Sequence, residues 1–137
     1  MTWELKSAGD HFPAFAAEWD RLNAALYGGH PLFDSRFVGP LLSHFGHDKE
    51  LLCVHRTSNT IDGALILRPL GLGRWALFLP PQAQAGAVML KDAHLLETLL
   101  PALPGYAWSL DLLSIDPLNS PDWTNLRLPR IVVPHAM

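Results

Sequence analysis

The first part of the chain shows two successive patterns of hydrophobic residues, each with its own spacing. Residues 2–8 alternate polar and apolar side chains, which predicts a short β-strand. Apolar residues then recur at steps of three and four, as on one face of an amphipathic helix. They are Phe12, Phe15, Trp19, Leu22 and Leu26. We expect Asp10 to cap this helix and Gly28-Gly29 to end it by allowing positive φ.

A second helical pattern lies within residues 30–46, with Asp34 or Ser35 as the expected cap. Its apolar face consists of Phe37, Val38, Leu41, Leu42 and Phe45. Gly39-Pro40 conflicts with a continuous helix, because proline removes a backbone hydrogen bond and clashes one turn back. We therefore expect either a kink or a helix that begins near Gly39, with Gly46 as its stop.

Residues 50–56, 60–70 and 74–80 predict three consecutive strands. The polar segment 57–60 is a hairpin signal between the first two strands, and Gly71-Leu72-Gly73 joins the second to the third. The small residues of segment 82–90 predict irregular structure.

A third helix should follow Asp92, which is a suitable cap. Its apolar face is Leu95, Leu96, Leu99, Leu100 and Leu103. The apolar run 106–116 predicts a central strand, and residues 130–135 predict a last short strand. The expected fold is therefore one α/β (α+β) domain over residues 1–137, with a mixed sheet of about six strands and about three helices.

The composition excludes some classes of function. Hydrophobic residues make up 49% of the chain but charged residues only 17%, where soluble domains usually have about a quarter. This predicts apolar surface that a second domain or subunit covers. The net charge of -3 and the scattered Lys and Arg argue against nucleic-acid binding. The single cysteine, Cys53, fits a reducing cytoplasm, and no segment reads as a signal peptide or membrane span.

Arg68 to Gly73 has the spacing R-x-x-G-x-G, with which acetyl-CoA-dependent transferases hold a pyrophosphate. Such a loop needs a strand before it and a helix after it, because amides at the helix N-terminus point at the anion. The residues after Gly73 include no cap and reach Pro80-Pro81 within about two turns. We therefore interpret the segment as a hairpin turn, with the cofactor loop as the alternative.

The expected order of elements is similar to the first part of the GNAT acyltransferase fold. That fold runs strand, two helices, three antiparallel strands, a cofactor loop, a helix and a strand. Residues 30–46 and 51–86 also resemble the N-terminal half of GNAT proteins of the BioF2-like or CelD-like group, which is related to the Fem transferases. The resemblance implies a degenerate N-terminal half that packs against a C-terminal half holding acyl-CoA.

In GNAT order the cofactor loop follows the third strand of the meander, which places it in segment 80–92. Gln82 is followed by Gly86 and Ala87, one residue off the family pattern Q/R-x-x-G-x-G/A. The resemblance therefore implies a decayed cofactor loop, in which Gln82, Gln84 and the Gly86 amide could keep residual contact with an anion. The alternative is a plain loop. We expect no cofactor on this chain, although the family implies acetyl-CoA or another acyl-CoA.

Three further candidates carry reactive groups. Asp111 lies in an apolar strand, where it could receive the amine proton in acyl transfer or form a salt bridge. His44 and His47 lack further ligands at metal-site spacing, so we predict no metal site. Cys53, between Leu52 and Val54, is expected to be a buried thiol and not a nucleophile.

Three functions remain open from the sequence. The first is an N-terminal GNAT-like half of an acyl-CoA N-acyltransferase, inactive alone and partnered by a catalytic half. The second is an interaction module that pairs with a second copy of itself, because the last strand, 130–135, offers an edge. The third is a complete small acetyltransferase, which requires a helix after Gly73.

Overall fold

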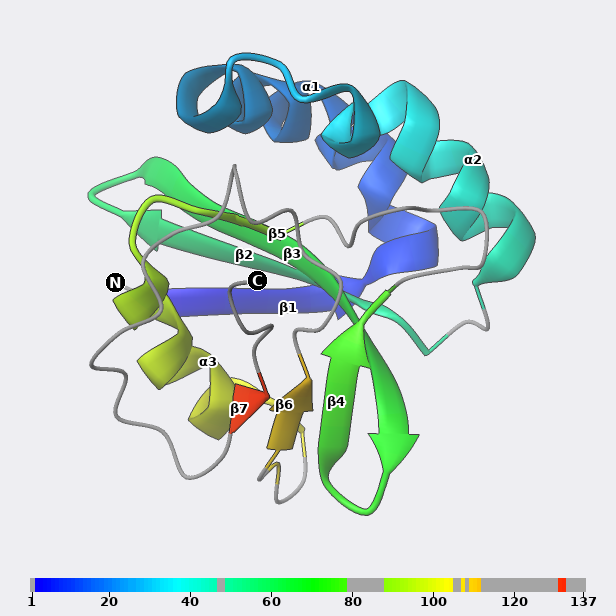
Figure 1. Cartoon of the computed structure of the whole chain (residues 1–137), viewed down its shortest axis with the longest axis vertical. Helices are drawn as coiled ribbons and strands as arrows, with labels where there is room; N and C mark the ends of the chain where they lie inside the picture. Colours follow the sequence, from blue (N-terminus) through cyan, green and yellow to red (C-terminus); the bar gives the residue numbers. More distant parts are fainter. Residues whose placement is uncertain are drawn as a thin grey trace, which may run out of the picture.

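The computed structural model describes residues 2–46, 49–78, 88–104, 107, 109–111 and 131–132. These residues form three α-helices, two 3₁₀ helices (η) and seven strands (Figure 1). In chain order they are β1 Thr2–Ser7, α1 Ala8–Tyr27, η1 Pro31–Phe33, α2 Ser35–Phe45, β2 Leu51–Thr57, β3 Thr60–Gly71, β4 Arg74–Leu77, β5 Val88–Leu90, η2 Ala93–Leu95, α3 Leu96–Ala102, β6 Ser109–Asp111 and β7 Ile131–Val132. The predicted class, a mixed sheet with about three helices, is confirmed.

Six of these strands follow one another across the sheet in the order β1-β2-β3-β4-β6-β7. Strands β1 to β4 are antiparallel neighbours, whereas β6 runs parallel to β4, and β7 runs parallel to β6. Parallel neighbours need a crossover, and α3 lies in the connection between β4 and β6. Strand β6 is paired on both sides, so the prediction of an interior strand is confirmed for Ser109–Asp111, while most of the predicted segment 106–116 lies outside the described residues.

Strands β4 and β5 continue one another along the same side of β3. After β4, the Phe78 N–H donates to the carbonyl of Ile66 (2.9 Å), and β5 resumes with Val88 opposite Leu65. The connecting residues 79–87 lie outside the described residues. The prediction of irregular structure up to residue 90 is wrong for Val88–Leu90, because these three side chains are buried in a strand.

The sheet separates two hydrophobic cores, because successive side chains on a strand point to opposite faces. On β2, Leu52 and Val54 belong to the core under α1 and α2, whereas Cys53 belongs to the core under α3. Figure 1 shows α1 and α2 together on one side of the sheet. The predicted apolar faces of α1 and α3 are confirmed by the burial of Trp19, Leu99 and their neighbours. On α2 the prediction is confirmed for Val38 and Leu42, whereas Phe37, Leu41 and Phe45 are half-buried and do not belong to the core.

Helix α1 begins earlier than its sequence predicts. Asp10 does not cap it, because the helix starts at Ala8, whose N–H donates to the carbonyl of Glu50 (2.9 Å). A contact with a distant segment has therefore replaced the local cap. Gly28 ends the helix in the left-handed region (φ 65°), as predicted.

Side chains of α1 fix the connection to α2. The Trp19 indole N–H donates to the carbonyl of Phe33 (2.6 Å). The buried Asn23 amide donates to the carbonyl of His30 (2.9 Å) and accepts from the His30 N–H (3.0 Å). These bonds satisfy the backbone of the turn, so the two helices keep one arrangement above the sheet.

Helix α2 is continuous from Ser35 to Phe45. Asp34 caps it, as predicted, by accepting from the Arg36 N–H (2.8 Å). The alternative that the helix begins near Gly39 is wrong, because the helix begins at Ser35 and runs through Pro40. The expected kink stays a prediction, while Gly46 ends the helix as expected.

Both predicted hairpins are confirmed. Strands β2 and β3 turn through Ser58-Asn59, and β3 and β4 turn through Leu72-Gly73. All four turn residues have positive φ, the backbone that two-residue hairpin loops of type I′ require.

Among the helices that the structure describes, none combines the length and apolar character needed to cross a membrane.

Candidate functional site

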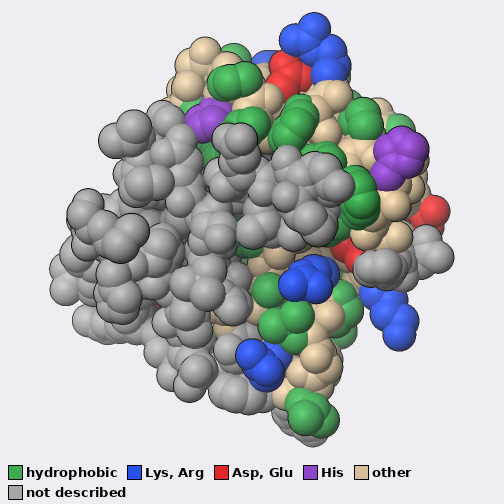
Figure 2. Space-filling model, turned by 45° about the vertical axis from the view of Figure 1, so that its right-hand side comes forward, with side chains coloured by type: hydrophobic (Ala, Val, Ile, Leu, Met, Phe, Trp, Pro, Cys, Tyr) green, Lys and Arg blue, Asp and Glu red, His purple; other side chains and the backbone are tan. Residues whose placement is uncertain are grey.

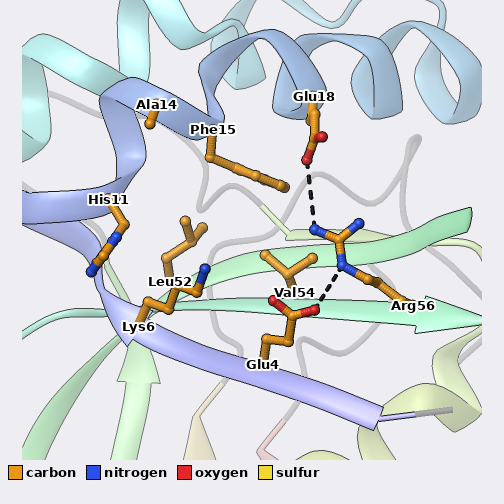
Figure 3. Close-up of a pocket in the computed structure, with 9 residues that line it drawn as sticks. All are labelled: Glu4, Lys6, His11, Ala14, Phe15, Glu18, Leu52, Val54 and Arg56. Atoms are coloured by element: carbon orange, nitrogen blue, oxygen red, sulfur yellow. Dashed lines mark hydrogen bonds and ion pairs between the residues drawn. The ribbon is translucent and has the colours of Figure 1, made fainter. Parts of the chain in front are cut away.

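A groove lies between α1 and the β1–β2 edge of the sheet (Figure 3). Its cavity volume is about 210 Å³. We call it the charged groove, and its lining residues are Glu4, Lys6, His11, Ala14, Phe15, Glu18, Leu52, Val54 and Arg56. Five of these nine carry an ionisable side chain, which distinguishes the groove from the helix–sheet interface around it.

The floor and one wall of the charged groove are apolar. Leu52 and Val54 form the floor, because both point from β2 toward α1 and are almost completely buried. Phe15 projects from α1 above them, as Figure 3 shows. An apolar surface of this kind binds the hydrocarbon part of a ligand, while the surrounding charges determine its orientation.

Arg56 lies at one end of the groove between two carboxylates. Its Nε donates to Glu4 Oε1 (2.7 Å), and its Nη2 lies 3.7 Å from Glu18 Oε2. The three side chains come from β2, β1 and α1, so they tie the helix to the sheet. All three are about one third to two fifths exposed, and pairs this exposed contribute little to stability, roughly 0–1 kcal/mol each.

Lys6 and His11 lie at the other end. Both are exposed, and within the described residues neither side chain makes an ion pair or a hydrogen bond. Glu4 and Lys6 share one face of β1, two residues apart, but Glu4 pairs with Arg56 and not with Lys6. The lysine ammonium is therefore available to a ligand.

A second polar cluster lies on the opposite face of the sheet. His55 is almost fully buried, and its Nδ1 donates to Asp62 Oδ1 (2.6 Å). Thr57 Oγ1 donates to the other oxygen of this carboxylate (2.8 Å), and the Trp3 ring packs edge-on against the imidazole. The register of β2 and β3 shifts between His55 and Arg56, so the Asp62 carboxylate holds the two strands together at this bulge.

This geometry makes His55 a structural residue. A carboxylate beside Nδ1 is the arrangement found in catalytic His–Asp pairs. The imidazole, however, is only 2% exposed, and a general base must reach the proton that it removes. The cluster therefore explains how the strands are aligned.

The R-x-x-G-x-G segment is the tip of the β3–β4 hairpin. Gly71, Leu72 and Gly73 all have positive φ, and β4 follows directly. In Figure 2 the hairpin forms the lowest part of the molecule, where hydrophobic and basic side chains lie side by side. The alternative of a pyrophosphate loop here is wrong, because the segment after Gly73 is a strand and provides no helix N-terminus.

The first turns of the two longer helices do not fit a pyrophosphate either. The first amide of α1 donates to the Glu50 carbonyl, and Asp10 places a negative charge in that turn. At α2 the Asp34 carboxylate occupies the N-terminus, and its hydrogen bonds from Arg36 hold its pKa below the usual range. A negative group at these positions repels an incoming phosphate.

The other predicted cofactor residues, Gln82, Gln84, Gly86 and Ala87, lie outside the described residues. Their roles stay predictions. The segment that follows them is a strand, since β5 begins at Val88.

Asp111 is the last residue of β6, where its backbone pairs with β4 and β7. The role of its side chain stays a prediction.

The structure places the remaining reactive candidates as follows. Cys53 is fully buried, and burial raises the pKa of its thiol, which favours the unreactive protonated form. His44 is exposed in the last turn of α2, while His47 lies outside the described residues. Within the described parts of the chain, no three His, Cys, Asp or Glu side chains come together to bind a metal ion.

Sequence reasoning missed the charged groove. The alternation of β1 places Glu4 and Lys6 on one face, and that of β2 places Leu52, Val54 and Arg56 on one face. These patterns were available signals, but they do not show that the two faces coincide under α1. That coincidence depends on the register in which Thr2 lies opposite Arg56.

Comparisons of the chain with families of known proteins, with characterised proteins and with solved structures found no match.

Proposed function

We propose that this chain is a GNAT-like half-domain of an acyl-CoA-dependent N-acyltransferase, which supports a catalytic half and does not catalyse by itself. The observation that carries the proposal is the order of elements from β1 to β6. It runs strand, two helices, three antiparallel strands, the short strand β5, a helix and a strand. Apart from β5, this is the order of helices and strands that the resemblance to the GNAT fold led us to expect.

A second observation favours the supporting role over catalysis. The glycines of the R-x-x-G-x-G segment form a hairpin, and the first turns of α1 and α2 are occupied by protein groups. Among the described residues, these positions do not cradle a pyrophosphate. The acyl-CoA would therefore be held by a partner domain, and this chain would shape the surface on which the partner lies.

Isothermal titration of acetyl-CoA into the isolated chain tests this role. We expect no measurable heat. Micromolar binding would overturn the half-domain proposal and would make the chain an enzyme candidate in its own right.

A second candidate function is self-association without catalysis. Within the described residues, β1 and β7 are the end strands of the main sheet path, and each pairs with one strand alone. A free sheet edge can pair with another chain. Sedimentation velocity over a hundredfold range of concentration tests this candidate, and a monomer throughout that range would reject it.

A further inference from the structure

We propose that the charged groove binds a small zwitterion of the amino-acid class, with its carboxylate toward Lys6 and its ammonium toward Glu4 and Glu18. This goes beyond the proposed acyltransferase role, which does not require a ligand at this place. The groove lies on the α1 side of the sheet, and none of its lining residues belongs to the R-x-x-G-x-G segment or to segment 80–92.

The distribution of charge indicates a zwitterion. Glu4 and Glu18 surround the single cation Arg56, which leaves one negative charge in excess at that end. At the opposite end Lys6 supplies one positive charge without a carboxylate partner in the described residues. A ligand that carries one positive and one negative group complements both ends, whereas a simple acid or a simple amine complements one.

The spacing of the two ends limits the length of the ligand. Glu4 and Lys6 are two residues apart on β1, which separates their attachment points by about 7 Å. His11 and Glu18 are seven residues apart on α1, which corresponds to about 10 Å along the helix. The side chains of Lys6, Glu4 and Glu18 reach from these attachment points into the groove, so a ligand that contacts both ends must be short. Amino acids with one to three carbons between the two charged groups are the class that we expect.

The volume and the floor of the groove agree with such a ligand. The cavity of about 210 Å³ is large enough to hold several water molecules. An amino acid of three or four carbons can replace most of them. Its methylene groups would lie on Leu52 and Val54 below Phe15, where Figure 3 shows an apolar surface between the charged ends.

Titration of the isolated chain with a defined series of probes tests the proposal. The zwitterions are glycine, β-alanine, 4-aminobutanoate and 6-aminohexanoate, and the single-charge controls are butanoate and butylamine. Binding is followed by ¹H–¹⁵N chemical-shift changes. We expect at least one of the three shorter zwitterions to bind tenfold more tightly than either control, with changes at Glu4, Lys6 and Glu18. Equal binding of butylamine or butanoate, or no saturation by any zwitterion, would overturn the proposal.

Substitutions at exposed positions identify the groups responsible. Lys6→Gln and Glu18→Gln should each weaken the best zwitterion at least fivefold, and Lys6→Arg should restore most of the affinity. Lys49→Gln and Asp10→Asn remove the same charges outside the groove and should change the affinity less than twofold. Unchanged binding by Lys6→Gln would reject the assignment. These titrations contain no acyl-CoA, so a negative result would leave the proposed acyltransferase role untouched. In the same way, acetyl-CoA binding by the isolated chain would overturn that role without affecting the zwitterion site.

Discussion

At the scale of single residues, it is space and not backbone angle that requires the glycine at position 46. Gly46 ends α2 with φ of -71°, which any residue can adopt. A Cβ built there would lie 2.5 Å from the Leu42 carbonyl oxygen and 2.8 Å from Glu50 Oε1. The Glu50 carbonyl also accepts a hydrogen bond from the first amide of α1. The close approach of Gly46 and Glu50 therefore joins the end of α2 to the start of α1.

We predict that Gly46→Ala destabilises the protein by about 1–3 kcal/mol, because backbone or buried side chains must move to admit the methyl group. The matched control is Gly9→Ala, which has no neighbouring atom within 4 Å of the added carbon. Gly9 lies in the first turns of α1, so the control should be neutral or stabilise by about 0.5 kcal/mol. Urea unfolding of both variants measures the difference. An unchanged free energy of unfolding for Gly46→Ala would contradict the close packing around this glycine.

At the scale of elements, the β3–β4 hairpin carries an unfavourable residue at its turn. Leu72 has φ of 55° and is 93% exposed, so it gains no burial energy in this chain to offset the strained backbone. The β2–β3 hairpin, by contrast, uses Ser58-Asn59, which suits positive φ better.

Leu72→Asn should stabilise the protein by about 0.5–1 kcal/mol, because Asn-Gly is the preferred pair for a two-residue turn. The control is Leu70→Asn, an exposed leucine of the same hairpin that lacks positive φ, and it should shift stability by less than about 0.5 kcal/mol. Thermal unfolding followed by circular dichroism compares the two. A destabilised Leu72→Asn would show that the leucine makes a contact essential to the folded chain.

A second element-scale contact joins the end of α1 to β5. The Tyr27 hydroxyl donates to the Val88 carbonyl and accepts from the Leu90 N–H, both at 3.3 Å. Burial raises the pKa of this tyrosine above its ordinary value, since the charged form would lose water. The hydroxyl thus bonds two backbone groups of β5 and joins the end of α1 to that strand.

We expect Tyr27→Phe to lower stability at pH 7 by about 0.5–1.5 kcal/mol, the usual net value of a hydrogen bond. Above about pH 10 the unfolded tyrosine ionises while the folded one stays protonated, so the native protein loses stability as pH rises. The phenylalanine variant has no ionisable hydroxyl at this position and does not lose stability in this way. The unfolding free energies of the native protein and the variant should therefore converge between pH 7 and pH 11. A difference that widens with pH would refute the assignment.

At the scale of the whole molecule, one sheet supplies the inner surface of both cores. Strands β2 and β3 contribute Leu52, Val54, Ala64 and Ile66 to the core under α1 and α2, and Cys53, Leu65 and Leu67 to the core under α3. They also have paired neighbours on both sides. Loss of either core therefore affects the same two strands.

Native-state hydrogen exchange should accordingly be slowest at the amides of β2 and β3, and these amides should exchange with a single free energy close to that of global unfolding. Amides of β1, which lies at the end of the sheet path, should exchange faster. Exchange of β2 at two distinct free energies would show instead that the two cores unfold separately.

The sequence by itself determined the features that depend on neighbouring residues. The periodicity of α1, the Asp34 cap, the Gly28 stop and the two hairpin turns follow from local backbone preferences, and the structure confirms them. The interpretation of the R-x-x-G-x-G segment as a hairpin was correct for the same reason, because the residues after Gly73 exclude a helix locally.

The tertiary structure decided the features in which distant segments meet. The Glu50 carbonyl moves the start of α1 to Ala8, and pairing with β3 makes Val88–Leu90 a strand although the local sequence predicted irregular structure. The charged groove joins Glu4 to Arg56 across 52 positions, through a strand register that no local pattern encodes. Local periodicity determines which face of each element a side chain occupies, but only packing determines which faces meet.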